Sequence, residues 1–187
     1  MIVAFGYKSR VGKNTCSNLL ELEFLELDPS LKLGLCSFAS ELKHVCNTMF
    51  NWAGLQGEHF YEEHPELKTE ILPELGKSPV SIWIEMSEKV AKTFHPAIWT
   101  KITLENQKED DFTIISDLRF PIEVEEIKNN NGIIVKVNRQ TYMHNDYKSD
   151  QALDDFTAWD YVIENNGTVE DLKEKISELA KKLMVLR

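Results

Sequence analysis

Residues 6–15 read Gly6-Tyr7-Lys8-Ser9-Arg10-Val11-Gly12-Lys13-Asn14-Thr15, and this stretch decides the fold class. An apolar run at 2–5 precedes it and is typical of a buried parallel strand. A helical pattern follows it, from about Asn14 through Leu22. A glycine-punctuated loop in this setting is typical of phosphate binding, because backbone N–H groups and the helix N-terminus face the anion. We expect Lys13 to reach the β- and γ-phosphates of a nucleotide.

The loop departs from the usual phosphate-loop spacing in two ways. Five residues, rather than four, separate Gly6 and Gly12, which puts Tyr7 at the position of the first glycine. Asn14 follows Lys13, so Thr15, whose hydroxyl is the expected contact to Mg²⁺, is displaced by one residue. The alternative is a strand–turn–helix with an incidental Gly-Lys pair. The flanking strand and helix patterns favour phosphate binding over that alternative.

Further along the chain, strand patterns alternate with helix patterns. The strand candidates are 33–38, 112–116, 133–137 and 161–163, and the helix candidates include 39–50, a helix from Pro121 ended by Gly132, and a final helix capped by Thr168. This alternation predicts an α/β fold with a parallel, doubly wound sheet flanked by helices. We expect a single domain over 1–187, with a mainly helical insertion at about 51–107.

Composition excludes several classes of function. The chain has 31 acidic and 21 basic residues, and its formal charge of −10 disfavours binding to duplex nucleic acid. No apolar run approaches the roughly 20 residues that span a bilayer, and the N-terminus lacks the features of a signal peptide. The three cysteines form no CxxC pair, which indicates reduced thiols and a cytoplasmic protein.

Three of the four arginines follow predicted strands or lie in the phosphate loop. Arg10 is in the loop, and Arg119 and Arg139 each come just after a strand candidate. Ligands of open α/β sheets bind at the carboxyl ends of strands, so we expect these guanidinium groups to converge on phosphoryl oxygens. The alternative is that Arg119 and Arg139 pair with nearby glutamates. Asp117, at a strand end, is expected to hold the water shell of Mg²⁺ or orient an acceptor, or else to cap the next helix or pair with Arg119.

Four segments together resemble the phage-type deoxynucleoside monophosphate kinases, a branch of the P-loop kinases. They are the phosphate loop, Phe38-Ala39-Ser40-Glu41-Leu42-Lys43, Ser116-Asp117-Leu118-Arg119-Phe120-Pro121-Ile122-Glu123, and a C-terminal part with Ser149-Asp150-Gln151-Ala152-Leu153 and Trp159-Asp160-Tyr161-Val162-Ile163-Glu164-Asn165. The third is the most specific. This chain has Asn14 and Asp150 where the family usually has Asp and Glu, and Ile122 where it has Asn.

The resemblance implies a P-loop kinase fold and a Mg²⁺-dependent transfer of the γ-phosphoryl group of ATP to a deoxynucleoside monophosphate. It implies catalytic roles for Lys13, Arg119 and Arg139, and ATP binding by Arg10, Val11, Gly12, Lys13, Asn14 and Thr15. It implies acceptor contacts from Lys43, Asp117, Arg119, Trp99, Lys148 and Gln151, with core packing the alternative for Trp99. Mg²⁺ would lie near Thr15 and Asp117, directly or through water, and a lid would lie at 139–150.

Two other functions stay open at this stage. One is a related P-loop kinase with another acceptor, such as phosphomevalonate or dephospho-coenzyme A. The other is a nucleotide-binding module without turnover, for which the irregular loop spacing and Asn14 are the support. A homodimer is left open, and the sequence names no preferred base.

Overall fold

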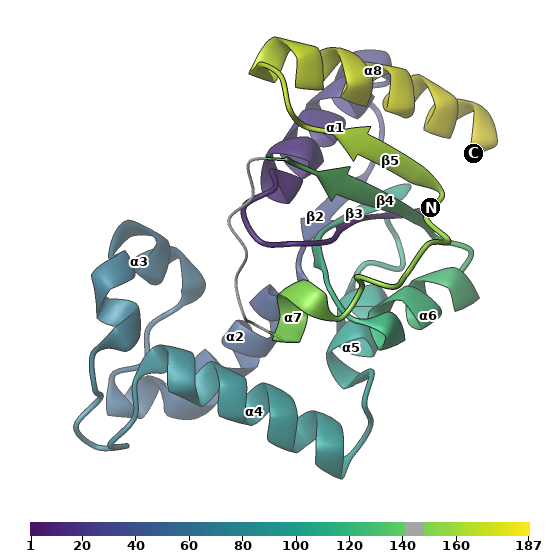
Figure 1. The fold of residues 1–187 in the computed structure, drawn as a ribbon. Helices are drawn as coiled ribbons and strands as arrows, with labels where there is room; N and C mark the ends of the chain where they lie inside the picture. Colours follow the sequence, from purple (N-terminus) through teal and green to yellow (C-terminus); the bar gives the residue numbers. More distant parts are fainter. Residues whose placement is uncertain (141–147) are drawn as a thin grey trace. The chain divides into compact units, whose positions relative to one another are not determined.

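The computed structural model describes residues 1–140 and 148–187 (Figure 1). The chain divides into two compact units, the first formed by Met1–Ser37 with Glu105–Arg187 and the second by Phe38–Leu104. The second unit begins at Phe38, earlier than the insertion that we expected from about residue 51. The single domain remains a prediction.

The first unit is built on a parallel sheet of five strands. They are β1 (Ile2–Gly6), β2 (Leu33–Cys36), β3 (Phe112–Leu118), β4 (Ile133–Asn138) and β5 (Tyr161–Glu164). Their order is β2-β3-β1-β4-β5, and every neighbouring pair is parallel. The α/β fold predicted from the alternation of elements is therefore confirmed. The central strand is β1, so the phosphate loop leaves the middle of the sheet.

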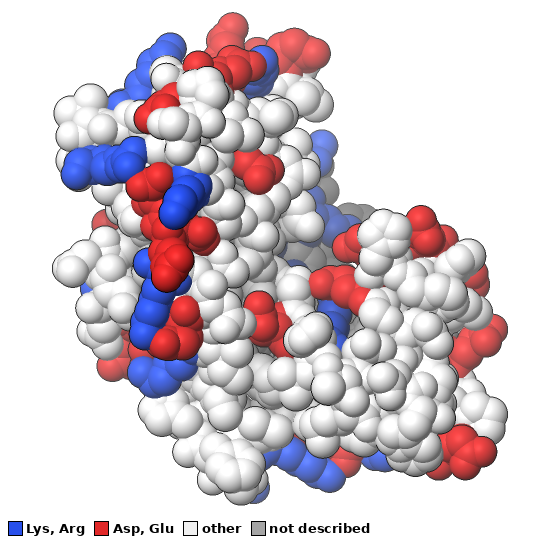
Figure 2. All heavy atoms as spheres, turned by 180° about the vertical axis from the view of Figure 1, so that it is seen from behind, with Lys and Arg blue, Asp and Glu red and all other residues white. Residues whose placement is uncertain are grey.

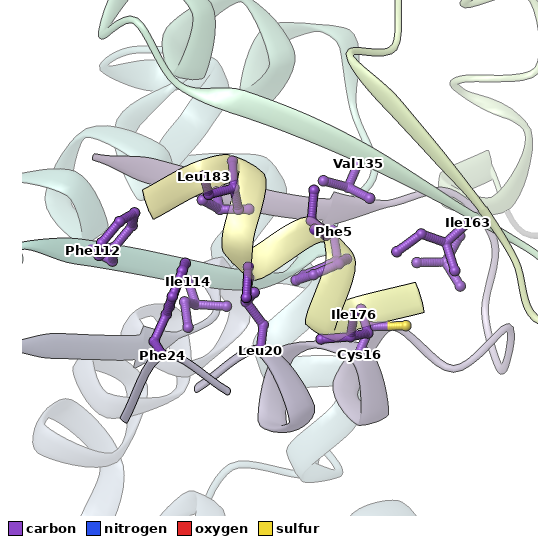
Figure 3. Close-up of a cluster of buried hydrophobic side chains, with 14 of the residues drawn as sticks. Phe5, Cys16, Leu20, Phe24, Phe112, Ile114, Val135, Ile163, Ile176 and Leu183 are labelled. Atoms are coloured by element: carbon purple, nitrogen blue, oxygen red, sulfur yellow. The ribbon is translucent and has the colours of Figure 1, made fainter. Parts of the chain in front are cut away.

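Helices cover both faces of this sheet. They are α1 (Lys13–Leu27), α6 (Pro121–Asn129), the short α7 (Lys148–Gln151) and α8 (Val169–Leu186). On one face, α1 and α8 pack on alternate side chains of the strands, such as Val3 and Phe5, which are fully buried. Figure 3 shows this core, with Leu20 of α1 and Leu183 of α8 among the sheet residues. On the other face α6 packs against β4.

The second unit is helical, as its sequence pattern predicts. It contains α2 (Phe38–Phe50), α3 (Glu58–Glu63), α4 (Pro79–Thr93), most of α5 (Ile98–Asn106) and the short 3-10 helices η1 (Asn51–Ala53) and η2 (Pro65–Thr69). Its own hydrophobic core is formed by Leu42, Cys46, Leu55, Tyr61, Ile82 and Trp83. The Ser78 hydroxyl caps α4, and Pro79 occupies its first turn.

Two local predictions are corrected. Strand β3 does not end at Ser116 but continues to Leu118, because Leu118 pairs with Gly6 of β1 in the ladder. Asn131, not Gly132, takes the left-handed conformation after α6, with φ 55°. Gly132 is required for a different reason, since a Cβ there would lie 2.4 Å from Cγ2 of Ile127.

On the face that Figure 2 presents, surface charge is mixed rather than gathered in one patch. Figure 2 shows acidic side chains interspersed with lysines and arginines on the face that it presents. In the described part of the chain, no helix is long and apolar enough to cross a bilayer.

Candidate active site

The phosphate loop between β1 and α1 has an unusual backbone. Tyr7, Arg10 and Gly12 have φ values of 100°, 57° and 101°, in the left-handed region that side chains other than glycine rarely adopt. Tyr7 therefore has the conformation that a glycine normally supplies at that position, as its place in the sequence predicts. Such strain is typical of loops that hold a ligand with their backbone.

The start of α1 is arranged to face an anion. Its N-cap residue, Gly12, gives no side-chain hydrogen bond to the first turn, and the first turn holds no acidic residue. Regular helical bonding begins where the Cys16 amide donates to the Gly12 carbonyl, at 2.9 Å. The amides before it are the groups that an anion at a helix N-terminus accepts from.

Packing around Tyr7 compensates for its backbone strain. Its ring meets the edge of Trp159, with centroids 6.4 Å apart, and Nζ of Lys136 lies 4.0 Å from the ring centroid. Gly6 allows this arrangement, because a Cβ there would lie 2.9 Å from the Trp159 ring. The β1 end of the loop is thereby fixed by residues far away in the sequence.

Lys13 is a buried cation with only 5% of its surface exposed. Its Nζ donates to the Lys8 carbonyl at 2.5 Å, within the loop itself. Burial, and to a smaller extent the positive charge of Arg119, lower the pKa of Lys13 to about 8, against the opposing effect of Asp117 and Asp150. A phosphate dianion would compensate the charge that this site holds.

One pocket of about 370 Å³ collects most of the expected site residues. It is lined by Arg10, Gly12, Lys13, Asn14, Thr15, Ser116, Asp117, Arg119 and Arg139. The structure brings the three arginines together, as their positions at strand ends predict. Four cations and one carboxylate line a polar pocket in a chain whose net charge is −10. Its electrostatics therefore suit a small polyphosphate.

Glu123 fixes the turn that carries Arg119. Its carboxylate accepts the backbone N–H groups of Arg119, at 2.7 Å, and Phe120, at 2.9 Å. Burial raises the pKa of Glu123 to about 8, and the Asp117 charge contributes to that rise, although the two N–H bonds lower it. The sequence pattern did not predict a role for Glu123 in the site, although its place in the first turn of α6 favours this contact.

Residues 86–176 match a family model described as deoxynucleotide monophosphate kinase. The match covers just under half of the chain and includes four pocket residues, Ser116, Asp117, Arg119 and Arg139. The match supports a nucleotide kinase. The resemblance inferred from the motifs is confirmed over this region, and the enzyme is a phosphotransferase.

Solved structures similar to this chain include two shikimate kinases. The one from Aquifex aeolicus has 11% sequence identity and a TM-score of 0.43, with 99% of each chain covered. The one from Acinetobacter baumannii, in complex with shikimate, has 13% identity and a TM-score of 0.42, covering 99% of this chain and 91% of that one. These scores are too low to carry an argument. No curated protein matches the sequence.

Of the expected acceptor residues, Gln151 does not line this pocket, and Lys43 and Trp99 belong to the second unit. Lys43, in the second unit, pairs with Glu58 at 2.5 Å, and its Nζ lies 5.4 Å from the centroid of the Trp83 ring. Trp99 packs against the core of the same unit, in agreement with the packing alternative. Gln151 is exposed at the end of α7. Lys148 begins α7, but its side chain, like residues 141–147 of the expected lid, lies outside the described part.

Val11, which was expected to bind ATP, does not line the pocket. Its side chain is 1% exposed and belongs to the core under the sheet. Its carbonyl accepts a hydrogen bond of 2.9 Å from Nδ2 of Asn165, which follows β5. The sequence did not indicate this support, because 154 residues separate the two partners.

The oxygen atoms around the pocket fit Mg²⁺ bound together with a nucleotide. Thr15, Ser116 and Asp117 line it, and hydroxyl and carboxylate oxygens suit this hard cation. Among the described residues there is no cluster of three or more His, Cys, Asp or Glu side chains that could hold a metal. Mg²⁺ commonly binds through one or two carboxylates and substrate phosphates, so the donors present match that mode.

Proposed function

We propose that this kinase transfers the γ-phosphoryl group of ATP to a deoxynucleoside 5′-monophosphate, forming ADP and the diphosphate. The observation that carries the proposal is the clustering of Lys13, Arg10, Arg119 and Arg139 with Asp117 at the N-terminus of α1. The family match over 86–176 supports the nucleotide acceptor.

The chemistry needs charge neutralisation more than a base. In the transfer, the bond between the γ-phosphorus and the β,γ-bridging oxygen breaks, and an oxygen of the acceptor phosphate bonds to that phosphorus. A monophosphate ester has a second pKa near 6, so at neutral pH the attacking oxygen carries charge without help from a base. The protein must bring two anions together and stabilise the transferring group, which positioned cations can do.

We assign the residues accordingly. The loop amides, Lys13 and Arg10 hold the donor phosphates, and Arg119 and Arg139 neutralise the transferring group. Thr15 and Asp117 hold Mg²⁺, directly or through water, and the ion would supply charge neutralisation between the donor phosphates.

On the acceptor side, we propose that Lys43 binds the monophosphate. It is now paired with Glu58, and this contact, at side-chain exposures of 24% and 31%, is one that an incoming phosphate could replace. Hydrogen bonding to Lys43 lowers the pKa of Glu58 against the effect of burial, so Glu58 is held ionised.

We propose the cytoplasm as the compartment in which the enzyme acts. Its substrates would be ATP and deoxynucleoside monophosphates, and the three cysteines, all within the described residues, form no disulfide. Neither duplex nucleic acid nor a membrane is part of the proposal.

The test is a coupled assay of ADP release with ATP, Mg²⁺ and a panel of acceptors. The panel holds the four DNA monophosphates, their ribose counterparts, phosphomevalonate, dephospho-coenzyme A and shikimate. We expect turnover on at least one deoxynucleotide, above the rate of ATP hydrolysis without acceptor. Omitting Mg²⁺ should abolish it.

Two results would refute the proposal. Turnover only on a compound that is not a nucleotide would give the enzyme another substrate. ATP binding without turnover on any acceptor would leave a nucleotide-binding module. A Lys13→Met variant serves as the matched control, since it removes the ammonium group and retains an unbranched side chain of similar length.

A further inference from the structure

Asp150 is a buried carboxylate outside the pocket lining. It lies in α7 and only 2% of its surface is exposed, and the sequence marked it only as the position where the resembled family usually has Glu. Burying a charge is costly unless opposite charges and hydrogen bonds compensate it. The partners of Asp150 therefore indicate what it does.

One oxygen of Asp150 joins three segments of the chain. Its Oδ1 accepts from the Ser9 amide at 3.0 Å, from the Ser9 hydroxyl at 2.7 Å and from Nη1 of Arg119 at 2.9 Å. Nη1 of Arg119 also donates to the Ser9 hydroxyl, at 2.9 Å, and to the Ser149 hydroxyl, at 3.4 Å. The phosphate loop, the end of β3 and α7 thus meet at this carboxylate.

We infer that Asp150 is a positioning residue, which holds the Arg119 guanidinium and the Ser9 turn of the phosphate loop in fixed relation to each other. The contacts to Asp150, Ser9 and Ser149 all use Nη1, while Arg119 also lines the pocket. The side chain is therefore anchored at one nitrogen on the side of Asp150.

Fixing Arg119 has a direct consequence for phosphoryl transfer. An arginine side chain has many rotamers, and a cation that is already oriented loses less entropy when it binds a phosphate. Misplacing a group in an active site by about 1 Å can reduce the rate by about a hundredfold. This inference rests on the proposed function, because the oriented cation is useful only where a phosphoryl group is bound.

An inhibitory role for Asp150 would involve the same contacts to Arg119 and Ser9. Asp150 could hold Arg119 away from phosphate, in which case neutralising the carboxylate would raise activity. A purely structural role is the third outcome, with a loss of activity that does not depend on Arg119. A double-mutant cycle separates the three, because it measures whether Asp150 acts through Arg119.

The experiment measures kcat and KM for Asp150→Asn, with and without Arg119→Ala, in the coupled assay. We expect Asp150→Asn to lower kcat/KM by about tenfold or more when Arg119 is present, and by less than about twofold when it is absent. Asp150→Glu, which keeps the charge, should recover part of the loss. An equal loss in both backgrounds would overturn the inference, and so would a gain of activity in Asp150→Asn.

A matched control and a second variant guard against a folding defect. Asp154→Asn removes an ion pair of 2.9 Å with Lys8 of the phosphate loop, an ion pair that does not involve Arg119, and should change kcat/KM by less than about twofold. If Asp150→Asn does not fold, Ser9→Ala in the same cycle tests the same network, because it removes one of the bonds that orient Arg119.

The positioning role of Asp150 can be tested even if the proposed kinase activity is not found. If the unmodified enzyme turns over no acceptor, the same cycle is measured as the affinity for ATP by titration calorimetry. Asp150→Asn should then weaken ATP binding only when Arg119 is present. Equal weakening in both backgrounds would contradict the positioning role.

Discussion

At the scale of single residues, the main feature of the site is a group of cationic side chains, of which Lys13 is buried away from water. Lys13 is the clearest case, because it is buried and its pKa is lowered to about 8. Burial disfavours the charged form of a lysine, and an anion nearby reverses that effect. The lysine has already lost its hydration on folding, so a bound phosphate interacts with it more favourably than with an exposed lysine.

Replacing Lys13 by Met should abolish turnover and leave the fold at least as stable. A lysine with a lowered pKa destabilises the fold at pH 7, where both the folded and unfolded states carry its charge. We expect kcat/KM to fall by at least about a hundredfold and the thermal unfolding midpoint to stay or rise. Activity within tenfold of the unmodified enzyme would contradict the phosphate-loop assignment.

The affinity for ATP should fall as pH rises above about 8. Below its pKa, Lys13 is already protonated when ATP binds. Above that pKa, Lys13 must take up a proton as the phosphate binds, so the affinity for ATP falls by about tenfold per pH unit. Arg119, Asp117, Asp150 and Cys16 all act on Lys13, and Glu123, whose pKa is also about 8, lies nearby.

Titration calorimetry between pH 7 and 9.5 measures this dependence. A Lys13→Arg variant is the control, because it keeps the charge at every pH and leaves the titration of Glu123 in place. The affinity for ATP should fall more steeply with pH in the unmodified enzyme than in Lys13→Arg. Equal slopes would assign the dependence to another group.

Replacing Arg119 by Ala should lower kcat/KM by far more than tenfold if the guanidinium meets the transferring phosphoryl group. Arg119→Lys should restore little, because an ammonium lacks the planar fork that binds two oxygens at once. Arg187→Ala is the control, since Arg187 pairs with Asp111 outside the pocket. A loss below about tenfold for Arg119→Ala would reduce it to a structural residue.

Residue types and spacing predicted the cations of the site but not what orients them. Lys13 and the three arginines could be predicted, because each lies in the phosphate loop or directly after a strand. Asp150 could not, since 141 residues separate it from Ser9 and its role depends on a tertiary contact. For the same reason the sequence did not indicate Asn165.

At the scale of elements, the phosphate loop is shaped by what packs behind it. Gly12 combines a φ of 101° with an approach so close that a Cβ would lie 2.4 Å from Nδ2 of Asn165. Asn165 in turn donates to the Val11 carbonyl. The end of β5 thus fixes the start of α1, and only glycine meets both demands.

Gly12→Ala should therefore weaken ATP binding and destabilise the fold. We expect a loss of about 1–3 kcal/mol in the free energy of unfolding from the backbone strain, with the contact to Asn165 adding to it. Gly76→Ala is the matched control, because Gly76 also has a positive φ, of 63°, but nothing within 4 Å of a Cβ. It should lose stability while ATP affinity, measured by calorimetry, is unchanged. Unchanged ATP affinity in Gly12→Ala would contradict the role of this turn.

Most elements could be predicted from hydrophobic patterns, and their ends depended on pairing. The apolar run at 112–116 indicated β3. The last two residues of the strand, Asp117 and Leu118, do not continue that run, and they belong to the strand because Leu118 pairs with Gly6 of β1. After α6, the turn uses Asn131 at positive φ, and packing against Ile127 explains Gly132. Local sequence does not distinguish a residue that needs a positive φ from a glycine that is needed because a side chain packs closely against it.

At the scale of the whole molecule, each compact unit has its own hydrophobic core. Leu20 is fully buried in the core of the first unit, and Ile82 is 4% exposed in that of the second. Replacing either by Ala should cost about 2–5 kcal/mol in the free energy of unfolding. Leu22→Ala, at a position 55% exposed, should change it by less than about 0.5 kcal/mol.

The same variants test the prediction of a single domain. If the chain unfolds as one unit, Leu20→Ala and Ile82→Ala will shift the same cooperative transition in urea. Two transitions, each moved by one variant only, would show that the units unfold separately and would contradict that prediction.

The central claim is that the pocket at the start of α1 transfers a phosphoryl group to a deoxynucleotide. The most direct measurement follows label from γ-³²P-ATP into product, with a mixture of the four deoxynucleoside monophosphates and either the unmodified enzyme or Lys13→Met. We predict label in a deoxynucleoside diphosphate with the unmodified enzyme and none with the variant. Label found only in inorganic phosphate, or equal transfer by both proteins, would contradict the claim.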